Sequence, residues 1–168
     1  LTAAEVNVAV GDYAMALNTT GGNNTAVGQN ALYANTTGAS NVAIGYAALD
    51  ANTTASNNTA IGRDALGANT TGTQNVAVGA YALDANTTAS YNTGIGYNSL
   101  TALTTGVTNT AVGNNTASAL TTGSDNTCIG VSALAGTIDG IRNTALGRSA
   151  LQANTTASNN TAAGYKAL

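Results

Sequence analysis

The segment Asn41-Val42-Ala43-Ile44-Gly45-Tyr46-Ala47-Ala48-Leu49-Asp50-Ala51-Asn52-Thr53-Thr54-Ala55-Ser56-Asn57 is one copy of a repeat that fills the chain. Asn followed by Thr or Val recurs at every seventeenth position from Asn7 to Asn160, with no insertion or deletion between copies. We number the positions of each copy from 0, at this asparagine, to +16. Nine full copies occupy residues 7–159, and a partial tenth occupies residues 160–168. This regularity is the strongest signal in the sequence.

The length of the repeat predicts the fold class. Helical repeat pairs need about 33 residues or more, whereas this shorter period suits one coil of a parallel β-solenoid. Equivalent residues would then stack at the strand spacing of about 4.8 Å, which requires an unbroken register. We therefore predict an all-β parallel β-solenoid over residues 1–168 as a single array, expected to be an excerpt of a longer fibre.

The composition excludes several classes of function. Ala, Gly, Asn and Thr make up 107 of the 168 residues, and the chain lacks His, Trp, Phe and Pro. Without His and with one Cys, a His-based catalytic or metal site, an internal disulfide and a thiolate zinc site are excluded. Four basic residues and a net charge of −3 do not make a nucleic-acid-binding surface, and no apolar run is long enough to span a bilayer. We expect no catalytic residue, no metal and no cofactor.

Two positions are constant in all ten copies. The Asn at position 0 predicts a ladder of stacked amides, although Asn is also a common turn residue. The Gly at position +4 predicts a bend or a positive φ angle at the end of each strand. The asparagines are Asn7, Asn24, Asn41, Asn58, Asn75, Asn92, Asn109, Asn126, Asn143 and Asn160, and the glycines are Gly11, Gly28, Gly45, Gly62, Gly79, Gly96, Gly113, Gly130, Gly147 and Gly164.

Positions +1 to +3 are expected to form a short strand. Position +1 is Thr or Val and position +3 is almost always Val, Ile or Leu, so we assign both to the coil interior. Position +2 would then face outward, and its restriction to very small residues predicts close packing against another chain. Recent gene duplication is the alternative, but positions +5, +6, +9 and +16 have varied. The candidate packing residues are Ala9, Ala26, Ala43, Ala60, Ala77, Gly94, Ala111, Cys128, Ala145 and Ala162.

The rest of the coil carries one large apolar residue, at position +8, which is Leu in eight copies and is expected to point inward. The segment from +5 to +10 has more helix than strand propensity, so a helical turn and a second strand both remain open. The tyrosines occupy several repeat positions. They are expected either to pack over the surface of the coil or to stack against sugar rings.

Six Asn-Thr-Thr segments match the acceptor pattern for N-glycosylation, and a turn role for the asparagine is the alternative. A source that glycosylates secreted proteins would place a glycan on one edge in most coils. The candidate acceptors are Asn18, Asn35, Asn52, Asn69, Asn86 and Asn154.

Each coil is small, and the chain has neither a disulfide nor a recognisable calcium motif, so association is expected to complete its stability. We predict a homo-oligomer, either a side-by-side trimer or an end-to-end filament.

The segments Asn41-Val-Ala-Ile-Gly45 and Asn75-Val-Ala-Val-Gly79 resemble the head repeat of YadA-like trimeric autotransporter adhesins. Copies with Thr, such as Asn58-Thr-Ala-Ile-Gly62, are similar to repeat arrays in phage tail fibres and large bacterial surface proteins. The resemblance covers all ten copies and implies a left-handed β-roll, three parallel chains and an adhesive or receptor-binding stalk. The family's repeats are shorter than the period of this chain, and the extra residues fall around Asn-Thr-Thr.

These observations predict a non-enzymatic structural fibre or adhesin segment, located outside the cell, on the cell surface or on a virion. Its expected partners are copies of itself and a surface receptor, with a glycan as one candidate. The second hypothesis is an ice-binding solenoid that presents Thr and Asn ladders. Glycoside hydrolysis needs a carboxylate pair, but only Asp50 and Asp84 share a repeat position, and Asp64 beside Arg63 is expected to be a solvated pair.

Overall fold

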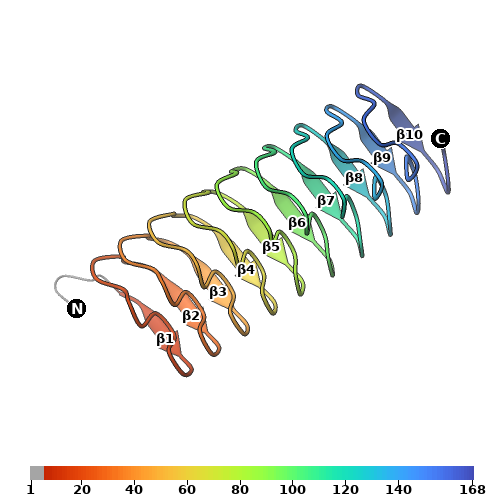
Figure 1. Ribbon diagram of the computed structural model, residues 1–168. Helices are drawn as coiled ribbons and strands as arrows, with labels where there is room; N and C mark the ends of the chain where they lie inside the picture. Colours follow the sequence, from red (N-terminus) through yellow and green to blue (C-terminus); the bar gives the residue numbers. More distant parts are fainter. Residues whose placement is uncertain (1–5) are drawn as a thin grey trace.

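The computed structural model describes residues 6–168, so residues 1–5 of the predicted array lie outside the described part. The chain winds into a row of stacked coils, and each coil contributes one short strand to a single sheet (Figure 1). The ten strands are parallel and neighbour one another in chain order, which confirms the predicted all-β parallel solenoid. The strands are β1 (Val8–Val10), β2 (Thr25–Val27), β3 (Val42–Ile44), β4 (Thr59–Ile61), β5 (Val76–Val78), β6 (Thr93–Ile95), β7 (Thr110–Val112), β8 (Thr127–Ile129), β9 (Thr144–Leu146) and β10 (Thr161–Ala163).

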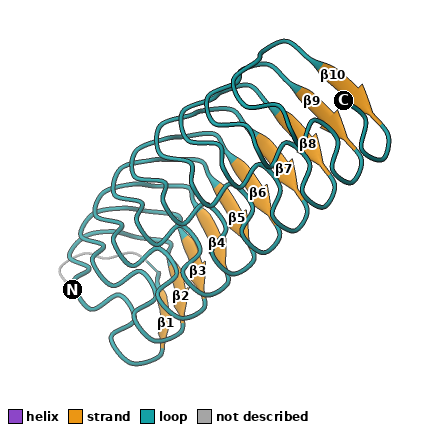
Figure 2. Ribbon diagram, turned by 45° about the vertical axis from the view of Figure 1, so that its right-hand side comes forward, coloured by secondary structure: helices purple, strands orange, loops and turns teal. Residues whose placement is uncertain are grey.

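The strands are stacked in the register of the repeat. Thr59 pairs with Val76, and Ala60 pairs with Ala77, so each residue lies beside its equivalent in the next copy. Figure 2 shows the strands along one side of the solenoid, with loops and turns closing the rest of every coil. Because side chains alternate between the faces of a strand, this register keeps each repeat position on one face throughout.

The glycine after each strand is required by the backbone. All ten glycines at position +4 have φ between +122° and +140°, a region that L side chains rarely adopt. The next coil also approaches closely, since a Cβ atom on Gly62 would lie 2.6 Å from the carbonyl carbon of Gly79. Both the conformation and the stacking therefore demand glycine here.

The segment from +5 to +10 is neither a helix nor a strand but a chain of tight turns. Its residues at +6 and +8 have positive φ in every coil, for example Asn30 at 58° and Leu32 at 55°. Its N–H groups bond alternately within the coil and between coils: Ala31 donates to Gly28 O at 3.2 Å, and Leu32 donates to Ala48 O at 2.9 Å. This alternation satisfies the backbone without regular secondary structure.

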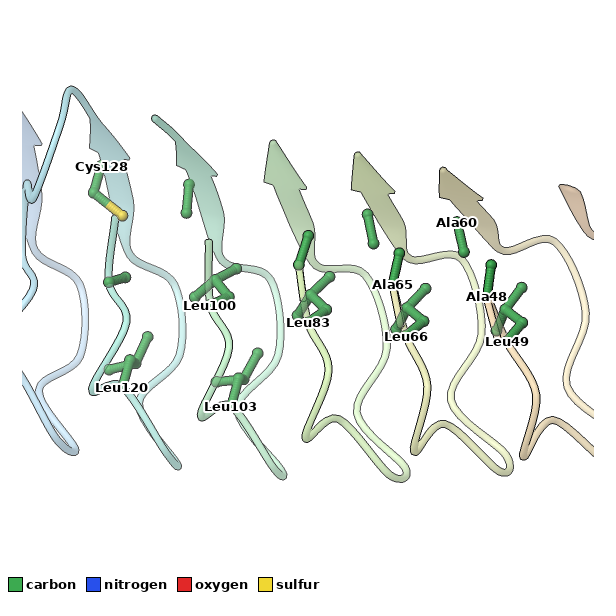
Figure 3. Packing of buried hydrophobic residues seen from close by; sticks show 14 of the residues in the cluster. Ala48, Leu49, Ala60, Ala65, Leu66, Leu83, Leu100, Leu103, Leu120 and Cys128 are labelled. Atoms are coloured by element: carbon green, nitrogen blue, oxygen red, sulfur yellow. The ribbon is translucent and has the colours of Figure 1, made fainter. Parts of the chain in front are cut away.

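The prediction for the faces of the strand was wrong. The residues at position +2 point into the coil and are buried, while those at +1 and +3 face outward. Figure 3 shows Ala60 inside the solenoid together with Ala65 and Leu66. The buried members of the set are Ala26, Ala43, Ala60, Ala77, Gly94, Ala111, Cys128, Ala145 and Ala162, and Ala9 is exposed in the first coil.

The physical reason for the small residues at +2 is the narrow interior. The leucines at +8 of coils 2 to 6 and of coil 8 are fully buried, as predicted, and fill most of their coils, for example Leu66 and Leu83. Leu168, at +8 of the partial last copy, is exposed. At Gly94, an added Cβ would already lie 3.3 Å from Leu83 Cγ and 3.2 Å from Ser99 O. The residues proposed for chain–chain packing are thus limited in size by their own chain's core.

Candidate functional site

The asparagines at position 0 form a hydrogen-bonded ladder along the solenoid. The Oδ1 atom of Asn41 accepts the backbone N–H of Asn58 at 3.0 Å, and the Oδ1 atom of Asn58 accepts that of Asn75 at 2.9 Å. The Nδ2 group of Asn41 donates to the carbonyl of Ala55 in its own coil at 2.9 Å. Each such amide joins two coils and also holds one coil closed, which is a structural role.

A second ladder, absent from the sequence-based predictions, is formed by the asparagines at position +11. Asn52 Nδ2 donates to Asn35 Oδ1 at 2.9 Å, and Asn69 Nδ2 donates to Asn52 Oδ1 at 3.2 Å. The ladder ends where Leu103 and Leu120 occupy position +11 (Figure 3). Asn86 Oδ1 is accordingly a buried oxygen with no hydrogen-bond partner, because the next coil offers it a leucine.

Burial of the asparagines at +11 contradicts four of the six predicted glycosylation sites. Asn35, Asn52, Asn69 and Asn86 have no exposed surface, and the Nδ2 atom that would carry a glycan lies inside the coil. Asn18 and Asn154 are partly buried, and their Nδ2 groups donate to Gly21 O and Ala157 O, both at 2.9 Å. The Asn-Thr-Thr segments are turns whose amides stabilise the coil, which was the alternative interpretation.

The outward face of the sheet carries two columns of side chains, which we call the outer columns. Position +1 supplies Thr and Val, and position +3 supplies Val, Ile and Leu, ending in Ala163. Ile61 and Ile95 remain 37% and 38% exposed although they are large and apolar. No charged residue interrupts either column across β1 to β10, so the solenoid presents a continuous, largely apolar strip.

Another side of the solenoid gathers most of the aromatic and acidic residues of the chain. We call it the aromatic corner, and it is formed by positions +5, +6 and +9 of the first six coils. Five of the seven tyrosines fall on these positions. Its main side chains are Asp12, Tyr13, Asn30, Tyr33, Tyr46, Asp50, Arg63, Asp64, Tyr81, Asp84, Tyr97 and Asn98.

Side chains from different coils contact one another along this corner. Tyr13 and Tyr33 form an edge-to-face pair with ring centroids 6.4 Å apart, and Tyr81 and Tyr97 form another at 6.0 Å. The guanidinium of Arg63 lies 5.4 Å from the ring centroid of Tyr46 and 5.8 Å from that of Tyr81. The row therefore contains linked side chains rather than isolated surface residues.

The carboxylates of the corner influence one another. Partial burial raises the pKa of Asp50 and of Asp84, and the charge of Asp64 raises both further. Their Oδ1 atoms lie 3.8 Å and 2.9 Å from the point where a side chain on Gly67 would begin. The predicted pair Arg63 and Asp64 is joined at 3.0 Å on the surface.

Cys128 lies inside the solenoid at position +2 and is a free cysteine. Burial raises the pKa of its thiol to about 12, so the reactive thiolate is not populated at neutral pH. We assign it a packing role equivalent to that of the alanines in the other coils.

Within residues 6–168 there is no group of three or more Cys, Asp or Glu side chains that could hold a metal ion. The same residues contain no helix of the length and apolarity needed to cross a membrane. Comparisons with protein-family models, curated proteins and solved structures give no match. The fold defines a β-solenoid repeat protein, and the likeness to YadA-like and tail-fibre repeats remains a prediction from the motifs.

The variable positions +5, +6 and +9 were not predicted to form one surface. The signal was available, because Tyr and Asp accumulate at +5, +6 and +9 and do so mainly in coils 1 to 6. What was missing was the turn geometry that brings these three positions to the same side.

Proposed function

We propose that the chain is a non-enzymatic structural segment of an extracellular or virion fibre, built to hold an attachment function away from a surface. The observation that supports this best is the uniform stacking, in which the same residue positions pair across all ten strands. In such a solenoid, contacts are local and length grows with the number of coils, which suits a spacer. We include in this proposal that the fibre attaches to a receptor on another surface.

The fibre is proposed to consist of chains associated side by side through the outer columns. Large apolar residues such as Ile61, Ile95 and Ile129 are left exposed there, and an apolar strip of this length is typical of an interaction surface. A second copy of the chain offers the same strip with the same coil spacing, so contacts repeat in register. The contact surface is thus assigned to +1 and +3 in place of +2.

Sedimentation equilibrium together with electron microscopy of negatively stained particles tests this proposal. We expect a homo-oligomer, a trimer in the first instance, with an elongated outline. The variant Ile61→Lys/Ile95→Lys should dissociate it to monomers, whereas the control Thr54→Lys/Thr71→Lys, on exposed +13 positions, should not. A monomeric wild-type chain, or dissociation by both variants, would contradict the assigned contact surface.

Ice binding is the second candidate function, and one observation favours it. Position +1, which is Thr in seven coils and Val in three, and the apolar position +3 form two columns at the strand spacing of about 4.8 Å, an array regular enough to order water. The threonines at +12, the first Thr of each Asn-Thr-Thr segment, are less suited to ice binding, because their hydroxyls donate to the next coil, as Thr36 Oγ1 does to Thr53 O at 3.0 Å. Thermal hysteresis of the purified chain decides between the candidates: ice binding requires it, and a fibre segment predicts none.

A further inference from the structure

The aromatic corner contains a shallow cavity of about 390 Å³, open to solvent, between the first three coils. Its lining consists of Tyr13, Asn30, Tyr33 and Asp50, which come from positions +6 and +9. This volume lies within the range of about 300–1,000 Å³ that is usual for small-ligand sites. All four side chains stand on repeat positions that vary freely, so the cavity is specific to these coils and is not a property of the repeat.

The two tyrosines supply the apolar wall. Tyr13 is 61% exposed and Tyr33 is 38% exposed, and their rings stand at 79° to each other. An edge-to-face pair leaves ring faces open while each ring limits the movement of the other. Such rigid faces suit a flat ligand with C–H groups on one side, at a low cost in side-chain entropy.

The polar wall complements these rings. Asp50 is half-buried and, when ionised, only accepts hydrogen bonds, whereas the amide of Asn30 both donates and accepts. A ligand with several hydroxyl groups can donate to the carboxylate and exchange hydrogen bonds with the amide. Apolar C–H faces combined with hydroxyl edges are the chemistry of a pyranose ring.

We propose that the cavity lined by Tyr13, Asn30, Tyr33 and Asp50 binds one pyranose unit of a neutral glycan, with further units following the aromatic corner toward Tyr46 and Tyr81. This inference rests on the proposed function, because it names the chemical class of the receptor to which the fibre segment attaches. The continuing row of rings explains why aromatic residues occur in coils 3, 5 and 6 on the same side.

The charges of the corner select a neutral ligand. Its four aspartates outnumber its one cation, Arg63, so an acidic saccharide would be repelled. A cationic ligand would meet the Arg63 guanidinium in the middle of the row, between Tyr46 and Tyr81. An uncharged ligand experiences neither repulsion.

Saturation-transfer NMR on the whole chain tests this, with pentasaccharides of glucose, mannose and N-acetylglucosamine as neutral probes. A heparin fragment and oligolysine serve as anionic and cationic probes. We expect binding of at least one neutral probe, weakened about fivefold to tenfold by Tyr13→Ala or Tyr33→Ala, and about tenfold or more by Asp50→Asn. Tyr91→Ala is the matched control, since Tyr91 is 57% exposed but stands at +16, outside the corner, and it should leave binding unchanged.

Three results would overturn the proposal: no neutral probe binds to the folded chain, only heparin or oligolysine binds, or Tyr91→Ala weakens binding as much as Tyr13→Ala. The circular dichroism spectrum and thermal melt of each variant show whether it is folded. Sedimentation of the same samples keeps the outcomes separate, because a fibre that lacks the glycan site would keep its oligomeric mass.

Discussion

The Oδ1 atom of Asn41 accepts a hydrogen bond from the backbone N–H of Asn58 at 3.0 Å, although the two residues belong to different copies of the repeat. The same bond recurs from Asn58 to Asn75 and from Asn75 to Asn92, each at 2.9 Å. A buried backbone N–H at the entrance of every strand from β2 onward is therefore satisfied by the preceding coil. This contact fixes the register of the solenoid in chemical terms.

The +11 ladder predicts a difference between two identical substitutions. Asn52→Leu interrupts the ladder and leaves Asn35 Oδ1 without its donor, in addition to the oxygen of Asn86 that already lacks one. Asn86→Leu only moves the ladder's end to Asn69, so the number of orphaned oxygens stays the same. We expect Asn52→Leu to cost about 1–3 kcal/mol more in free energy of unfolding, measured by urea denaturation. Equal costs would contradict the ladder.

The inward orientation of position +2 is tested by enlarging it. Ala60→Leu should overpack the coil against Leu66 and lower the free energy of unfolding by about 1–3 kcal/mol. Its neighbour Ile61 faces outward, so Ile61→Thr should change the stability of the chain by less than about 0.5 kcal/mol. Denaturation is measured at protein concentrations where the chain is monomeric. The reverse order would place +2 outside, as the sequence had suggested.

Glycine at +4 should be irreplaceable, whereas glycine at +9 should not. Gly62→Ala places a Cβ 2.6 Å from the backbone of the next coil at a φ of +136°, and we expect a loss of about 1–3 kcal/mol or more. In Gly67→Ala the one contact shorter than 3.0 Å is with the movable carboxylate of Asp84, at 2.9 Å, so this substitution should cost much less. Thermal melts of the two variants make the comparison, and a stable Gly62→Ala chain would refute it.

Cys128 should be unreactive in the folded chain. Its thiol is buried with a pKa of about 12, against about 9 when exposed, so a thiol reagent at pH 8 should modify it only after unfolding in urea. Because the folded thiol holds its proton more tightly, the contribution of Cys128 to the free energy of unfolding is fully present below about pH 9. That contribution is lost as the pH rises from about 9 toward about 12. Cys128→Ala, which restores the residue of the neighbouring coils, should remove that part of the pH dependence. Rapid labelling of the native chain would show that the side chain is accessible.

The fold was predictable because the repeat determines it. An unbroken period of this length is too short for pairs of helices and suits coils that stack on one another. The constant Asn and Gly mark the start and the end of each strand. The inward leucine followed from being the one large apolar residue in each coil.

The orientation of the strand was not predictable from residue types. In such a short strand, Thr-Ala-Ile fits either face, and the usual rule places the larger apolar groups inside. Here Leu66 and Leu83 enter from the opposite wall and leave space only for a methyl group, so the β-branched residues are displaced outward. The aromatic corner was equally hidden, because positive φ at positions such as Asp64 and Leu66 gives the turn a course that propensities do not describe.

Insertion of additional coils tests the central claim most directly. Copies of residues 41–57 inserted after residue 57 should lengthen the particle by about 4.8 Å each, with an unchanged cross-section, as measured by small-angle X-ray scattering. An inserted copy that lacks a single residue cannot match its neighbours at every position, so it should destabilise the stack at that coil, which a whole copy should not do. Growth that does not follow the number of whole copies, or a shortened copy that is tolerated equally well, would contradict the stacked rod.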